Sequence, residues 1–142
     1  MKLKYIVLLC LGLISPPSLF ANDLDSLSEL ISKGKSDEVI SRVNQHIKKY
    51  PNDPELKFIH GAILDHFGKT REAKEVFLLL SNKYPKNHII KNNLGVIYIK
   101  LGEYFNARIC FESALRLKTD YQEAKLNLQA IQRKHTLFIA SK

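Results

Sequence analysis

The sequence predicts an all-α protein, an α-solenoid of antiparallel helix pairs. Gly34, Gly68 and Gly102 follow one another at a constant step of 34, which we call the repeat step. Apolar residues between these glycines follow helical spacing, and no segment alternates apolar and polar residues as a half-buried strand would. A period of this length is typical of solenoids in which each unit is a pair of helices that buries its apolar face against its neighbours.

Other residues recur with the same repeat step. They are Gly61 and Gly95, Ala73 and Ala107, Phe77 and Phe111, and Pro51 and Pro85. The three glycines between helices are expected at positive φ, where glycine closes a helix without strain. A glycine inside a helix costs about 1 kcal/mol relative to alanine, so Gly61 and Gly95 indicate close helix crossings against a small residue on the opposing helix.

The helical spacing predicts three helix pairs and one final helix. The pairs cover residues 22–53, 54–87 and 88–121, a C-terminal capping helix covers residues 121–134, and residues 135–142 form a tail. Within the second pair we expect helices over residues 54–67 and 70–83, and within the third over residues 89–100 and 104–118. In the first pair the inward residues are Leu24, Leu27 and Ile31, then Val39, Val43 and Ile47.

Residues 1–21 are expected to be a secretory signal peptide. Lys2 and Lys4 precede an apolar run from Tyr5 to Ile14, and Leu19-Phe20-Ala21 favours cleavage after Ala21. The run is about ten residues long, whereas a transmembrane helix needs roughly 20. Retention of this segment as an uncleaved anchor is the alternative.

The charge is concentrated at the C-terminal end. The chain has a net charge of +8, and removal of residues 1–21 leaves 20 basic and 14 acidic residues, of which residues 116–142 contribute +4. In an exported protein such a patch suits an acidic protein surface, anionic lipid or cell-wall polymer better than nucleic acid. A solvated helix face is the alternative. Cys110 is the one cysteine after cleavage, so no intrachain disulfide forms, and we expect Cys110 to be a buried structural residue.

With these residues in place, the chain resembles the tetratricopeptide repeat family. In residues 88–121 the matching positions are Leu94, Gly95, Tyr98, Gly102, Ala107, Phe111 and Ala114. In residues 54–87 they are Gly61, Gly68, Ala73, Phe77 and Pro85, whereas residues 22–53 keep mainly Gly34 and Pro51. The resemblance implies a scaffold that binds an extended peptide or partner helix in a concave groove lined by the first helix of each pair.

No catalytic or metal-binding pattern accompanies the repeats. His60 and His66 are six positions apart and do not share a helical face, and no Cys, Asp or Glu completes a set of metal ligands with them. The sequence also lacks a glycine-rich phosphate loop, a Gly-x-Ser-x-Gly elbow and a paired zinc motif. We therefore expect no enzyme activity, no cofactor and no metal.

The first helices supply the residues expected in the partner-binding groove. They are Phe58, Asp65, His66, Asn92, Asn93, Val96, Lys100, Asn127, Ala130 and Arg133. Asn93 and Asn127 are again separated by the repeat step, and an asparagine in a groove can donate to and accept from a peptide backbone. The alternative is that they satisfy neighbouring helix or loop ends.

These observations predict a non-catalytic protein-interaction scaffold of a bacterial cell envelope. We expect it to be periplasmic or secreted after signal cleavage, with membrane contact only peripheral or through an uncleaved signal, and an oligomer is possible. A second hypothesis is a structural module that binds anionic envelope polymer or lipid head groups through Arg116, Lys118, Lys125, Arg133 and Lys134. A third is an effector secreted out of the cell.

Overall fold

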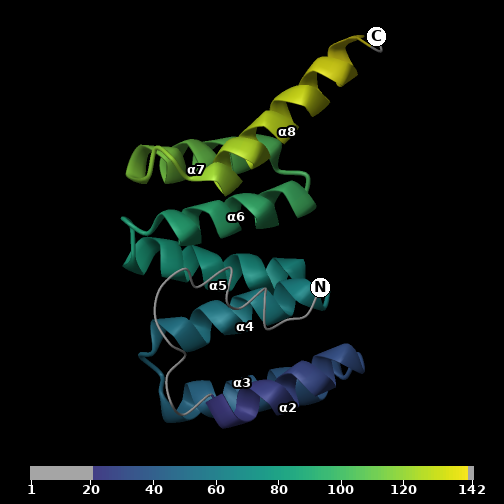
Figure 1. Ribbon diagram of the computed structural model, residues 1–142, viewed down its shortest axis with the longest axis vertical. Coiled ribbons are helices and arrows are strands. Elements are labelled where there is room, and N and C mark those ends of the chain that lie inside the picture. The colour runs from purple at the N-terminus through teal and green to yellow at the C-terminus, as the bar shows by residue number, and fades with distance from the viewer. Residues whose placement is uncertain (1–20, 141–142) are drawn as a thin grey trace. The chain divides into compact units, whose positions relative to one another are not determined.

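The computed structural model describes the backbone of residues 21–140 and the side chains of residues 26–133. Residues 21–140 form seven α-helices and no strand (Figure 1). The helices are α2 (Ala21–Ser32), α3 (Ser36–Lys49), α4 (Pro54–His66), α5 (Thr70–Lys83), α6 (His88–Lys100), α7 (Tyr104–Leu117) and α8 (Gln122–Ala140). The chain divides into two compact units between Ile63 and Leu64, within α4. The predicted signal peptide lies, except for Ala21, outside the described residues.

The helix boundaries repeat with the predicted period. Helices α3, α5 and α7 each have 14 residues, and both their first and last residues are one repeat step apart from one helix to the next. Helices α4 and α6 are related in the same way, and α8 begins one repeat step after α6. The prediction of an all-α architecture made of repeated helix pairs is thus confirmed.

The turns inside the helix pairs share one geometry. Gly34, Gly68 and Gly102 have φ values of 69°, 76° and 78°, the left-handed region that glycine enters without steric cost. After each glycine, the next backbone N–H bonds to a carbonyl five positions earlier, with N to O distances of 3.0, 2.8 and 2.8 Å. This bond closes the preceding helix in a Schellman motif. The predicted role of the three glycines is confirmed.

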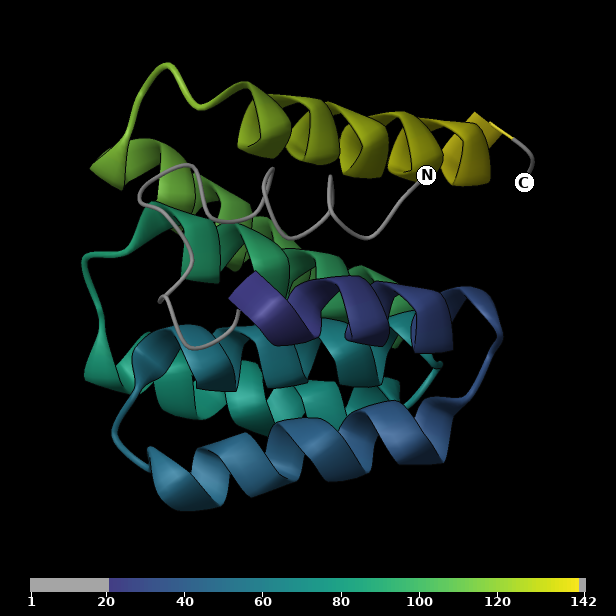
Figure 2. The ribbon, with the colours of Figure 1, turned by 60° about the horizontal axis from the view of Figure 1, so that its bottom comes forward.

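In the first unit, α2 and α3 form an antiparallel pair (Figure 2). Leu27, Val39 and Val43 have exposed fractions of 2%, 0% and 0%. The part of α4 that belongs to this unit adds buried residues at Leu56, Phe58, Ile59 and Ile63. The inward positions of α3 are one helical turn apart, so one stripe of an otherwise polar helix supplies the core.

In the second unit, α6 packs against α5, α7 and α8. Gly95 makes the contact with α7 possible, because a Cβ atom at this position would lie 2.5 Å from Cε1 of Phe111. Phe111, Ala107 and Ala114 are 0% exposed, and Ala124 of α8 joins the same cluster. The predicted close crossing at Gly95 is therefore observed, but the opposing group is the ring of Phe111 and not the small residue that we expected.

The last helix differs from its predicted length. We predicted an end near Lys134 and a tail over residues 135–142, but α8 continues to Ala140. Neither glycine nor proline occurs after Gln122, so no residue type that stops a helix is present. Along the described part of the chain, no helix combines the length and the apolar character needed to cross a bilayer.

Candidate interaction surface

The predicted groove residues of the second unit lie at the end of α4, on α6 and on α8. Two hydrogen bonds join these segments. Lys100 Nζ donates to Asp65 Oδ2 at 2.6 Å, and Asn127 Nδ2 donates to Asn92 Oδ1 at 3.0 Å. Four of the predicted residues are thereby brought together, although in pairs that the sequence did not specify. We call the surface formed by Asp65, His66, Asn93, Val96, Lys100, Asn127, Ala130 and Arg133 the first-helix surface.

The asparagine amides are used inside the protein. Asn93 Nδ2 donates to the carbonyl oxygen of Ile89 at 2.9 Å, one turn earlier in α6. Asn127 Nδ2 is bound to Asn92, as described above. The amide donors thus satisfy neighbouring helix groups, which was the alternative we considered. The two Oδ1 atoms, of Asn93 and Asn127, accept no hydrogen bond from any described residue and are the acceptors that this surface offers.

Exposure separates the predicted residues into two groups. His66, Lys100, Ala130 and Arg133 are exposed, whereas Asp65, Asn93, Val96 and Asn127 are half-buried. Phe58 and Asn92 are each only 7% exposed and offer almost no surface to a partner, contrary to the expectation for a groove residue. Phe58 belongs to the core of the first unit, and the amide of Asn92 is covered because it pairs with Asn127.

The sequence reasoning missed a cavity of about 160 Å³ between α5, α6 and α7. It is lined by Ser81, Lys91, Leu94, Tyr98, Asn106, Ile109, Cys110 and Ser113. Burial raises the pKa of Cys110 to about 11, so its thiol stays protonated near neutral pH. The prediction that Cys110 is buried is confirmed. One sequence signal could have identified the cavity: Lys57, Lys91 and Lys125 recur with the repeat step.

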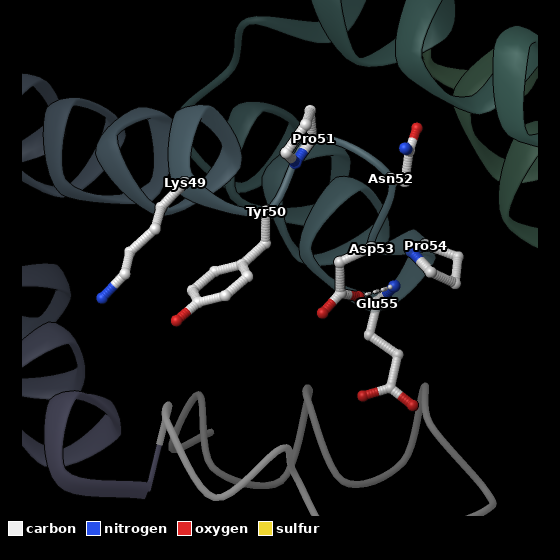
Figure 3. A pocket seen from close by; sticks show the side chains of 7 residues that line it. All are labelled: Lys49, Tyr50, Pro51, Asn52, Asp53, Pro54 and Glu55. Carbon is white, nitrogen blue, oxygen red and sulfur yellow. Dashed lines mark hydrogen bonds between the residues drawn. The ribbon is translucent and has the colours of Figure 1, made fainter.

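A larger, open hollow of about 620 Å³ lies at the connection between α3 and α4 (Figure 3). Its lining comes from residues 49–55. Asp53 Oδ1 accepts from the backbone N–H groups of Glu55 and Leu56 at 2.8 and 3.2 Å, which caps α4. Burial, followed by the charge of Asp53, raises the pKa of Glu55. These lining residues thus serve a helix start, and among the described residues no group of three potential metal ligands is found.

The contacts described for the basic residues near the C-terminal end are with uncharged groups. Arg116 Nη2 donates to Ser113 Oγ at 3.1 Å, and Lys118 Nζ lies 5.9 Å from the ring centroid of Tyr121. Neither these two residues nor Lys125 forms an ion pair with a described carboxylate. The side chain of Lys134 lies outside the described residues. The cations of this end are therefore available for a partner, as a polyanion-binding module would require.

Comparison with known proteins agrees with this fold. Residues 90–121, which cover most of α6 and all of α7, match the family model of the tetratricopeptide repeat. The crystal structure of the Sgt2 TPR domain from Aspergillus fumigatus is similar with a TM-score of 0.70 and 17% identity, over 86% of this chain and 82% of that one. The structure of MamA MSR-1 C2 is similar with a TM-score of 0.64 and 15% identity, over 94% of this chain and 77% of that one.

A curated relative matches a shorter stretch. The auxiliary subunit NAA15 of the N-terminal acetyltransferase A complex from Arabidopsis thaliana is 30% identical over 86 residues. The match covers 61% of this chain and 10% of the relative, so the chain spans about a tenth of that protein's length.

Together these findings show a match to one tetratricopeptide repeat at residues 90–121 and an all-α solenoid fold. This fold typically mediates protein–protein interaction, and the family is generally non-catalytic.

Proposed function

We propose that this chain is a non-catalytic scaffold that binds a peptide or partner helix along the first-helix surface. The observation that carries the proposal is the tetratricopeptide repeat at residues 90–121, whose first helix, α6, is joined by side-chain hydrogen bonds to the end of α4 and to α8. In this family the first helices line the groove that receives a partner.

The chemistry of the surface favours a partner with free backbone N–H groups and some negative charge. The Oδ1 atoms of Asn93 and Asn127 can accept from a peptide backbone in extended conformation. Lys100 and Arg133 are exposed and add positive charge to this surface. Lys100 has one carboxylate partner already, Asp65, so Arg133 is the cation better placed to attract an acidic side chain.

We also propose that the protein acts in a bacterial cell envelope, after export to the periplasm or beyond. The support is the basic, apolar and cleavage-type sequence of residues 1–21. Expression of the full chain in a bacterial host tests this directly. The envelope fraction should contain a product whose mass corresponds to a chain that begins at Asn22, and a product found only in the cytoplasm at full mass would contradict export.

Site-specific photo-crosslinking tests the binding surface. A benzophenone amino acid at Ala130, which is exposed on α8, should crosslink to a discrete protein partner in the envelope. The matched control is the same amino acid at Gln45, exposed on α3. Crosslinks of equal yield at both positions, or none at Ala130, would contradict binding at the first-helix surface.

The unpaired cations near the C-terminal end favour the polyanion hypothesis. Repeating the binding measurements at different salt concentrations distinguishes it from binding at the first-helix surface. A groove contact should survive moderate salt, because most of it is hydrogen bonding and packing. A charge-driven contact with anionic polymer or lipid should fade steeply between low and physiological ionic strength. Retention on anionic vesicles at low salt, with no protein crosslink at Ala130, would favour the polyanion-binding module.

A further inference from the structure

The cavity between α5, α6 and α7 contains an ammonium group without a carboxylate partner among the described residues. Lys91 is half-buried, and its Nζ donates to the neutral hydroxyl of Ser81 at 2.7 Å. A charge removed from water is normally compensated by an opposite charge or by several hydrogen bonds. Lys57 and Lys125 occupy the same register, but the positions equivalent to Ser81 are Ile47 and Leu115, which carry no hydroxyl. Of the three lysines, Lys91 alone has a hydroxyl partner at this position.

The acidic residues of α7 and of the turn before it already form ion pairs with other cations. Glu103 accepts from Lys74 at 3.2 Å and from Asn106 at 2.8 Å. Glu112 lies 3.8 Å from Arg108 one turn earlier. Rearrangement of either carboxylate toward Lys91 would break an existing ion pair. Glu75 of α5 acts on the neighbouring Tyr98, but its carboxylate does not pair with Lys91 either. The ammonium group of Lys91 is therefore open to a carboxylate from a partner.

The remaining lining groups suit a carboxylate. The hydroxyls of Tyr98 and Ser113 can donate, and burial raises the pKa of Tyr98, so its phenol keeps its proton. The volume of about 160 Å³ corresponds to roughly five water molecules. It can hold one acidic side chain, and it is smaller than the cavities that accept drug-sized ligands.

The rim of the cavity is apolar on the side of α7. Ile109 lines the cavity and is 43% exposed, and Phe105, one turn earlier, is 67% exposed. Residues one turn apart on a helix present neighbouring side chains, so these two form one apolar edge. A cationic hollow beside an apolar edge is complementary to an acidic residue next to an apolar one on a partner.

We propose that this cavity is a second docking site, in which Lys91, Tyr98 and Ser113 hold a Glu or Asp side chain of a partner protein while Phe105 and Ile109 cover its apolar neighbour. The site lies between α5, α6 and α7, and its α6 residues, Lys91, Leu94 and Tyr98, are not those of the first-helix surface. The Cys110 thiol beside it is protonated near neutral pH, so it adds no negative charge that would compete with the partner's carboxylate.

The test begins with selection of a random dodecapeptide display library on the full chain at physiological salt. Enriched peptides should carry Glu or Asp beside Leu, Ile or Phe. Changing that acid to its amide in a synthetic, fluorescently labelled peptide should weaken binding about tenfold or more in anisotropy titrations, because a charge-assisted hydrogen bond is lost. Lys91→Met should weaken binding of the acidic peptide to the same extent. It should leave binding of the amide peptide unchanged.

Matched controls decide the outcome. Lys57→Met, at the equivalent register position of α4, should leave peptide affinity unchanged. If circular dichroism shows that Lys91→Met does not fold, Ile109→Asp at the exposed rim replaces it. The new carboxylate should repel the acidic peptide and lower its affinity by a similar factor. Enrichment without acids, unchanged affinity in the Lys91 or Ile109 variant, or glutarate binding as tightly as the peptide would overturn the proposal. Crosslinking at Ala130 is independent of all these outcomes.

Discussion

The first helix pair, α2 and α3, and the third, α6 and α7, solve the same packing problem with opposite residues. Two repeat steps relate Leu27 to Gly95 and Val43 to Phe111. In the third pair the first helix has glycine and the second helix has a large ring. In the first pair the first helix has leucine and the second helix has the smaller valine. All four positions are buried.

This difference teaches that the repeat preserves the volume between its two helices more closely than the residue at each position. Cores tolerate exchanges of apolar residues when the total volume is kept. The third register position does not follow this exchange, since the larger Val39 stands where the other pairs have Ala73 and Ala107, and all three are 0% exposed. Residues 22–53 are therefore a structural repeat although few of their residues match the family pattern.

The largest expected effect on stability comes from placing the leucine of the first helix pair at the equivalent position of the third pair. Gly95→Leu should destabilise the protein by about 3 kcal/mol, because even a Cβ atom would lie 2.5 Å from the Phe111 ring and the core must shift. Urea denaturation followed by circular dichroism measures the loss. If Gly95→Leu were tolerated, the close crossing would not be required for the fold.

A double variant sharpens the comparison. Phe111→Val alone should cost about 2 kcal/mol through the cavity it leaves. Gly95→Leu combined with Phe111→Val reproduces the first pair's arrangement, and it should recover more than half of the stability lost by Gly95→Leu. If the double variant lost as much stability as the two single variants together, volume would not be exchanged between the helices.

A smaller effect is expected at the helix starts, where the two units are alike. Asn87 Oδ1 accepts from the backbone N–H groups of Ile89 and Ile90 at 3.0 and 3.1 Å, and Asp53, one repeat step earlier, caps α4 in the same way. Asn87→Ala and Asp53→Ala should each cost about 1 kcal/mol in urea denaturation. Asn82→Ala, on an exposed position of α5, is the control and should change stability by less than about 0.5 kcal/mol.

Most of the fold could be predicted because glycine marks the turns and the period repeats. Gly34, Gly68 and Gly102 placed the turns, and the predicted helices of the second and third pairs agree with the structure to within one residue at each end. The end of α8 could not be placed, because no glycine or proline marks it. The replacement of Gly95 and Phe111 by Leu27 and Val43 in the first pair could not be recognised from the sequence, because pattern matching compares positions one at a time.

The candidate surface was predicted less well, for a physical reason. A helix of the stack is covered on several sides, so spacing along one helix does not tell which residues a neighbouring helix will bury. Asn92 is buried because α8 brings Asn127 to it, and Lys91 meets Ser81 because α5 crosses α6 there. Such pairings depend on contacts between helices. The binding roles of the first-helix surface remain predictions.

The smallest expected effect concerns pH and the first residue of α6. Burial, then the charge of Lys118, lowers the pKa of His88 below its ordinary value of 6.5, against the opposing charges of Asp120 and Glu123. The native state therefore favours neutral His88, and its contribution to stability is present above pH 6.5 and is lost as pH falls through the lowered pKa. The corresponding residue of α4 is Pro54, which does not titrate. Between pH 7 and pH 5, about the span of a histidine titration, the urea midpoint of the unaltered chain should fall more than that of His88→Gln, because all other titrating groups are shared. Parallel curves for the two proteins would show that His88 titrates alike in the folded and unfolded chain.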